Sequence, residues 1–214
     1  MKNLIIVVAA LMLFSCGSQE KKTVEAGEAI ATDTVTTLQA IAYTVDAAAS
    51  SVAWTGSEGF AFNLDHAHNG TLAITKGNLL TSDSLFTGSV EIDMRSLKVL
   101  DIKKEASNKK LTNHLLSADF FEAEKFPMAT FEIVSATPID ADSARVTGNL
   151  TLKGMTKSVV IPAKIGKSDS TLTATAKFYI NRKDWNMHYR SEDSFGDEMI
   201  RPEVLIELNI VAKK

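Results

Sequence analysis

The chain has 214 residues, with 23 basic and 26 acidic side chains and a net charge of −3 at neutral pH. Nucleic-acid binding needs a concentrated basic face, so this balance speaks against a nucleic-acid partner. Cys16 is the only cysteine, which excludes an internal disulfide and a metal site built from several thiolates.

The first element is an apolar leader. Lys2 lies in a polar start, an unbroken apolar run covers residues 4–14, and Ser15 stands directly before Cys16. Secretory signal peptides have this layout. The run is shorter than the roughly 20 apolar residues that span a bilayer. We therefore expect residues 1–15 to be removed as a signal peptide.

A cysteine at this junction resembles the lipobox of bacterial lipoproteins, in which the thiol receives a diacylglycerol. On this resemblance Cys16 is acylated, becomes the first residue of the mature chain and anchors it to a membrane. An exported protein of the cell envelope is implied, facing the periplasm or the cell surface. The alternative is a stray cysteine in an ordinary signal peptide.

The next segment, residues 16–40, contains no aromatic side chain and no sustained period of 2 or 3.6. We interpret it as a flexible tether that carries acylated Cys16, with a short helix over Val24–Ala31 as the alternative. Residues 41–214 then form a single domain, because about 170 residues suit one ordinary core.

Period-2 alternation dominates the domain and predicts β-strands. It is clearest over Ala144–Lys153, where Val146, Leu150 and Leu152 share one face, and over Thr171–Asn181. Further strands are predicted at Tyr43–Asp46, Ser51–Thr55, Gly70–Thr75, Ser89–Arg95, Ala129–Ala136, Ser158–Ile165 and Glu203–Lys213. Breakers at 76–78, 82–84, 140–142, 153–155 and 166–170 separate the strands. The fold class is all-β, a sandwich or a barrel.

One segment of the domain lacks alternation. Asp101–Ser117 carries Leu111 and Leu115 one turn apart, which predicts the only substantial helix. Four lysines line its charged face: Lys103, Lys104, Lys109 and Lys110. A solvated surface is the simplest interpretation of this face, and attraction to anionic lipid is the sharper one.

Enzyme motifs are sparse. The sequence has no nucleophile elbow, no phosphate-binding glycine loop and no outstanding carboxylate pair. His66 and His68 share one face of a strand, but zinc needs further ligands, and only the distant His114 and His188 remain as histidines. We therefore predict no enzyme and assign no catalytic residue, no metal and no cofactor. An enzyme or metal protein that uses His66 and His68 is kept as the weakest hypothesis.

A distinctive motif lies between His114 and Phe131 and reads HLLSADFFEAEKFPMATF. It resembles the signature of the YceI-like family, also described as polyisoprenoid-binding lipocalin-like proteins. Further pieces of the pattern follow in order at Tyr43–Asp46, Ser51–Trp54, His68–Gly70, Val90–Leu97, Val146–Lys157, Asn181–Trp185 and Leu205–Lys214. The resemblance covers residues 41–214 without a gap.

The resemblance implies an extended antiparallel lipocalin-like barrel of about eight strands. It also implies a long-chain isoprenoid or similar amphiphile as the ligand, held in an apolar tunnel and bound, stored or transported at the cell envelope. We expect the inward-facing side chains to line this tunnel: Trp54, Phe62, Ile74, Val90, Ile92, Phe131, Ile133, Val146, Leu150, Leu152, Phe178, Ile206 and Leu208. His114, Arg182 or Tyr189 would bind the headgroup near the tunnel entrance.

Two segments differ from the simplest family pattern, FAFNLDHAH at 60–68 and WNMHY at 185–189. A barrel of this size is either filled by its own side chains or hollow enough for one small ligand, and alternation does not distinguish the two. The alternative function is therefore a ligand-free barrel that acts as an envelope stress or interaction protein. The sequence also leaves open whether the chain forms a homodimer.

Overall fold

A computed structural model of the chain describes residues 22–32, 40–60, 63–82, 86–191 and 198–214. The strands are β1 (Gly27–Glu28), β2 (Ile41–Val45), β3 (Ser51–Phe60), β4 (Asn63–Thr81), β5 (Phe86–Val99), β6 (Met128–Pro138), β7 (Ser143–Leu152), β8 (Met155–Lys167), β9 (Thr171–Asn181) and β10 (Glu198–Lys213). An α-helix, α1 (Glu105–Leu116), follows β5, and a short 3-10 helix, η1 (Arg182–Trp185), follows β9. Within the described residues, no helix is long and apolar enough to cross a membrane.

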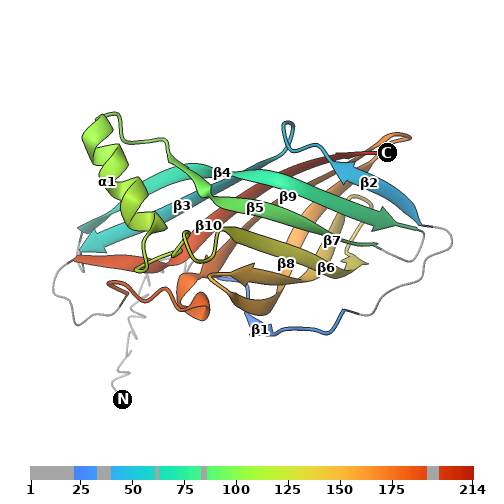
Figure 1. Ribbon diagram of the computed structural model, residues 1–214. Coiled ribbons are helices and arrows are strands. Elements are labelled where there is room, and N and C mark those ends of the chain that lie inside the picture. The colour runs from blue at the N-terminus through green and yellow to red at the C-terminus, as the bar shows by residue number, and fades with distance from the viewer. Residues whose placement is uncertain (1–21, 33–39, 61–62, 83–85, 192–197) are drawn as a thin grey trace, which may run out of the picture.

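Eight of the strands close into an antiparallel barrel (Figure 1). Each strand from β3 to β10 pairs with the next one along the chain, and β10 returns to β3 through the register Ile206 opposite Trp54. The two short strands fill gaps in this wall: β2 lies between β4 and β10, and β1 pairs with β8. The prediction of a lipocalin-like all-β barrel is thus confirmed.

The barrel has two different ends. We call the end that carries α1, η1 and the turn between β7 and β8 the helix end, which lies at the left of Figure 1. Lys153 in that turn donates to the carbonyl oxygen of Ala118 at 2.7 Å, so the turn reaches the segment after α1. The opposite end, with the turns at 139–142 and 168–170, is the far end.

Alternation located the strands but shortened several of them. Residues 76–78, predicted as a turn, lie inside β4, where Gly77 pairs with Val90. The register shifts between Ile74 and Lys76. Such an irregularity interrupts the alternation without ending the strand, so the sequence there resembles a turn. The helix is confirmed, but it begins at Glu105 and not at Asp101.

The N-terminal segment differs from its prediction. Residues 22–32 are extended along the barrel, whereas we expected a flexible tether or a short helix. The amide of Val24 donates to the carbonyl oxygen of Tyr179 at 2.7 Å. The buried side chain of Asn149 donates to the carbonyl of Ile30 at 2.7 Å and accepts from its amide at 2.9 Å. Hydrogen bonds to backbone atoms do not depend on a side-chain period, so the alternation of the sequence gave no sign of these contacts.

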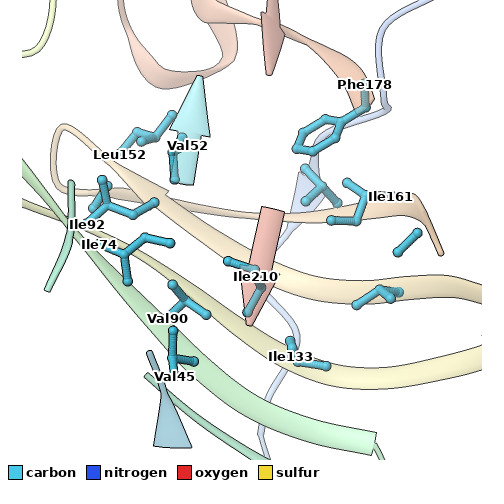
Figure 2. Close-up of a cluster of buried hydrophobic side chains, with 14 of the residues drawn as sticks. Val45, Val52, Ile74, Val90, Ile92, Ile133, Leu152, Ile161, Phe178 and Ile210 are labelled. Carbon is cyan, nitrogen blue, oxygen red and sulfur yellow. The ribbon is translucent and has the colours of Figure 1, made fainter. Parts of the chain in front are cut away.

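The core lies inside the barrel, where the inward side chains of all the long strands meet (Figure 2). The side chains of Ile92, Ile161 and Phe178 point into this interior from three different strands, β5, β8 and β9. Trp185 of η1 is fully buried, and its Nε1 donates to the carbonyl oxygen of Leu150 at 3.1 Å. The segment after β9 therefore contributes a buried side chain to the core at the helix end.

Candidate functional site

The barrel is hollow. A cavity of about 410 Å³ lies in the half nearest the helix end, and a second one of about 70 Å³ continues toward the far end. Five side chains border both cavities and so separate them: Val52, Ile92, Phe131, Ile161 and Leu208. The interior is therefore not filled by the protein's own side chains. The alternation of the sequence could not distinguish a filled barrel from a hollow one.

Two aromatic rings leave room for the large cavity by lying against glycines. Gly70 stands opposite Trp54, and a Cβ at Gly70 would lie 2.7 Å from Cζ2 of the indole. A Cβ at Gly148 would lie 2.5 Å from Cζ of Phe131. Contacts this short do not occur between carbon atoms, so each ring would clash with a side chain at its glycine. Backbone carbonyls add to this limit, since a Cβ at Gly70 would also meet the oxygen of Lys98 and a Cβ at Gly148 the oxygen of Glu132.

Most of the side chains that we expected to line a tunnel border one of the two cavities. The large cavity is bordered by Trp54, Ile92, Phe131, Leu150, Leu152, Phe178, Ile206 and Leu208. The small cavity is bordered by Val90, Ile92, Phe131, Ile133, Val146 and Leu208. Ile74 belongs to the core cluster and borders neither of these cavities. Phe62 lies outside the described residues.

Sequence reasoning missed several lining residues. Leu111 and Leu115 of α1 face the large cavity, so the helix forms part of its wall. Met187 follows η1 and is 2% exposed. Val159 and Ile161 lie on the inward face of β8, and the alternation of that strand could have identified them. The helix and loop residues give no such signal, because their inward faces depend on tertiary packing.

Polar side chains gather on the large cavity near the helix end. We call this set the rim: Glu58, His68, Lys110, His114, Arg182, Tyr189, Arg190 and Arg201. Basic groups outnumber the single carboxylate, so the rim favours a polar or anionic group over a cation. The small cavity, by contrast, is lined almost wholly by aliphatic and aromatic side chains.

His114, one of the three expected headgroup residues, lies in an aromatic cluster. Its ring stands edge-on to Phe120 at 5.1 Å and to Tyr189 at 4.8 Å between centroids. Nε2 lies 3.0 Å from the Oδ2 atom of Asp119. Tyr189 and His114 thus lie side by side on the rim, as the headgroup hypothesis requires.

Arg182 has a different role from the one we expected. It is 2% exposed, and its guanidinium donates to the carbonyl oxygens of Met187, Tyr189, Ile200 and Arg201. Burial lowers the pKa of this group to about 10, and the charge of Glu203 partly opposes that shift. Because its donors are used by backbone carbonyls, Arg182 fixes the segment after η1 and adds positive charge beneath the rim.

His68 of the rim also contacts Asp101, which lies outside the rim. Nδ1 of His68 lies 2.7 Å from Oδ2 of Asp101, and Glu58 lies 3.8 Å from Nε2. Burial acts to raise the pKa of Asp101, but hydrogen bonds from His68 and from the Asn69 amide outweigh it and hold the pKa below its usual value. The His66 and His68 rings stack at 6.3 Å. Among the described residues, no group of three or more potential ligands is placed to hold a metal ion.

Trp54 contributes an unusual donor. The side chain borders the large cavity and is 8% exposed, and its buried Nε1 has no hydrogen-bond partner among the described residues. A buried donor without a partner costs about 1–3 kcal/mol. Among the described residues, the wall of the large cavity therefore contains a buried donor that no protein group satisfies.

A known domain family matches this chain over residues 43–212, and its description is YceI-like domain. The chain belongs to the YceI-like family. A UPF0312 protein of Pseudomonas aeruginosa is 53% identical over 57 residues, and a YceI protein of Escherichia coli is 49% identical over 57 residues. Each match covers 26% of this chain and 29% of the relative, so the matched stretch spans less than a third of the curated relatives.

Solved structures agree on the fold. BcnA of Burkholderia cenocepacia superposes with a TM-score of 0.62 at 22% identity, covering 79% of this chain and 99% of BcnA. A polyisoprenoid binding domain from Saccharophagus degradans, implicated in plant cell wall breakdown, gives a TM-score of 0.57 at 14% identity and covers 80% and 97%. At these identities the likeness establishes the YceI-like barrel alone.

Proposed function

We propose that this YceI-like protein binds a polyisoprenoid or similar long-chain amphiphile in its barrel. The observation that carries the proposal is the apolar cavity of about 410 Å³ with a polar rim at one end. Each buried methylene contributes roughly 0.8 kcal/mol, so an alkyl or prenyl chain needs no specific polar contacts to bind tightly. The role is binding and not catalysis, with no resident cofactor.

The polar end of the ligand would lie at the rim. His114 and Tyr189 offer hydrogen-bonding groups there, and Arg182 supplies positive charge while four backbone carbonyls occupy most of its donors. The unpartnered Nε1 of Trp54 would be satisfied by an acceptor on the ligand. The domain from Saccharophagus degradans described as polyisoprenoid binding has this fold, which supports the class of ligand.

The test fills the cavity without disturbing the wall. A Cβ at Gly56 would meet no atom within 4 Å, and Gly56 borders the large cavity. Gly56→Phe should therefore occupy the cavity and sharply reduce the prenyl lipid that mass spectrometry recovers per mole of natively expressed protein. The matched control is Thr55→Phe, one residue earlier on β3, which borders neither cavity.

The control should retain the lipid content of the parent, with circular dichroism verifying the fold of both variants. An empty parent would reject the ligand hypothesis and favour the ligand-free barrel. Equal lipid in the parent and both variants would mean that the ligand lies elsewhere.

We further propose that acylated Cys16 anchors the protein to a membrane of the cell envelope. Cys16→Ser removes the acceptor thiol, so the variant should lose the acyl chains and leave the membrane fraction. Mass spectrometry of the N-terminal peptide and fractionation of cells measure both effects. A variant that stays with the membrane as the parent does would contradict the anchor.

A further inference from the structure

Positive charge is concentrated beside the cavity. Residues 98–110 carry five lysines and two acidic side chains, although the whole chain has more acidic than basic residues. The lysines are Lys98, Lys103, Lys104, Lys109 and Lys110, and all of them are exposed. The turns of the far end hold Asp140, Asp142 and Asp169. Lys164 and Lys167 lie near the same turns, so the far end mixes both signs of charge, whereas lysines dominate residues 98–110.

The lysines of the helix end also differ from others in their partners. Elsewhere Lys76 pairs with Glu91 at 3.1 Å, and Lys177 pairs with Glu207 at 2.8 Å. In the part of the chain that the structure describes, no carboxylate forms an ion pair with a lysine of residues 98–110. Among the described residues, these lysines are therefore not neutralised by ion pairs.

Helix stability does not explain this placement. Lys104 is the N-cap residue of α1 and makes no side-chain capping hydrogen bond, and Lys103 precedes it. The N-terminus of a helix carries partial positive charge, so lysines there repel it. Both side chains add to a positive field at this point, and an external anion would relieve the repulsion.

The same helix forms part of the cavity wall. Lys110, Leu111, His114 and Leu115 border the large cavity. Leu100, just before α1, is 51% exposed. A basic surface with an exposed leucine beside a lipid cavity has the composition of a membrane-binding surface.

The first described residues of the chain lie close to this end. Thr23 pairs with Tyr179, two residues before the end of β9 at the helix end. The seven residue steps from Cys16 to Thr23 span at most about 25 Å. An acylated Cys16 therefore keeps the helix end within that distance of its membrane.

We propose that the helix end of the barrel docks on an anionic lipid surface through the lysines of residues 98–110 and Leu100, so that the ligand passes between bilayer and cavity there. This inference rests on the proposed function. It names the partner of the site as the surface of the membrane from which the ligand comes. Lysine charge holds the barrel on the surface, and Leu100 enters the headgroup layer.

Vesicle binding tests the docking surface. The protein is produced without residues 1–15, so that Cys16 is not acylated and every described residue is kept. It should sediment with phosphatidylcholine vesicles that contain phosphatidylglycerol, in a salt-sensitive manner, and not with phosphatidylcholine alone. Each lysine near an anionic surface contributes about five-fold to partitioning, so Lys103→Glu with Lys104→Glu should weaken binding by at least about thirty-fold, because each change also adds a negative charge. Glutamates at the start of α1 favour the helix, so this variant should fold.

The matched control is Lys164→Glu with Lys167→Glu, two exposed lysines of β8 near the far end. It should bind nearly as the parent does. A second pair of variants reports orientation: Leu100→Trp should show blue-shifted emission on anionic vesicles, whereas Ile139→Trp, 53% exposed at the far end, should not.

A parent that ignores anionic vesicles, or equal losses in the two lysine variants, would overturn the docking surface. So would a shift at Ile139→Trp that matches the shift at Leu100→Trp. Recovered prenyl lipid is measured separately. Its absence with intact vesicle binding would reject the proposed ligand and leave the surface standing.

Discussion

The two cavities of this barrel share the same alternating strands, yet one holds about 410 Å³ and the other about 70 Å³. In the large cavity, Trp54 and Phe131 lie against glycines and leave the space between them open. In the small cavity, aliphatic side chains such as Val90, Ile133 and Val146 meet across the barrel. The difference shows that alternation fixes which side chains point inward, whereas ring orientation and small residues fix how much space they leave.

The two cavities also differ in their boundaries. The large one reaches a rim of basic and aromatic groups, and the small one has no charged lining residue. An amphiphile would therefore enter with its tail toward the far end and its polar group at the rim. Three positions test this difference: Arg182 beneath the rim, Phe131 between the two cavities, and Gly148 against the Phe131 ring.

The largest effect is expected at Arg182, which supports the rim. Arg182→Ala removes the donors for four backbone carbonyls and should lower the free energy of unfolding by about 3–5 kcal/mol. Urea unfolding measures the change. The matched control, Arg95→Ala, breaks only the exposed ion pair with Asp93 at 3.2 Å and should cost about 0–1 kcal/mol. Similar costs for the two variants would show that the guanidinium does not hold the segment after η1.

The second-largest effect is expected at Phe131, one of the side chains that separate the two cavities. Phe131 borders both cavities, so Phe131→Ala should join them and cost about 2–4 kcal/mol in unfolding free energy. If a lipid tail ends at this ring, the variant should also bind longer chains, which mass spectrometry of recovered lipid would reveal. Phe126→Ala, in a loop residue that borders neither cavity, is the control for chain length. An unchanged chain-length distribution would mean that Phe131 does not limit the tail.

Two glycine variants should have smaller effects on the free energy of unfolding. Gly148→Ala places a methyl group against the Phe131 ring and the Glu132 carbonyl, and should destabilise the fold by about 1–3 kcal/mol. Gly56→Ala points into open space and should change stability by less than about 1 kcal/mol. Thermal unfolding of both variants tests this order. The reverse order would contradict the packing of Phe131 against Gly148.

The smallest effect is a pH dependence at the helix end. The pKa of Asp101 is lower in the folded chain than its ordinary value, because the bonds from His68 and the Asn69 amide outweigh burial. Its carboxylate therefore stabilises the fold above the unfolded pKa of about 3.9, and this contribution is lost as the pH falls through the folded value. Asp101→Asn should remove part of the loss of stability on acidification, at most about 1 kcal/mol.

Urea unfolding at a series of pH values measures that contribution. His68→Ala removes one of the two bonds and should flatten the same part of the curve. An Asp101→Asn protein that follows the parent curve throughout would show that this contact does not contribute.

The sequence by itself determined the all-β class, most of the strands and their inward faces, and its resemblance to the YceI-like family implied the barrel. Val146, Leu150 and Leu152 fall on one face of a strand by period alone, and the structure places that face toward the interior. The helix was equally legible, because Asp101–Ser117 breaks the alternation. These properties are local, since side-chain period follows directly from backbone conformation.

The cavity, the rim and the N-terminal segment were decided only by the tertiary structure. Leu111 became a wall of the cavity because α1 packs over the helix end, and Arg182 became a structural support because four carbonyls converge on it. Asn149 lies on the polar face of its strand, yet it is buried by its bonds to Ile30, which is 119 residues away in the chain. Long-range backbone contacts and the volume that packed side chains leave open have no period in the sequence, so only the folded chain reveals them.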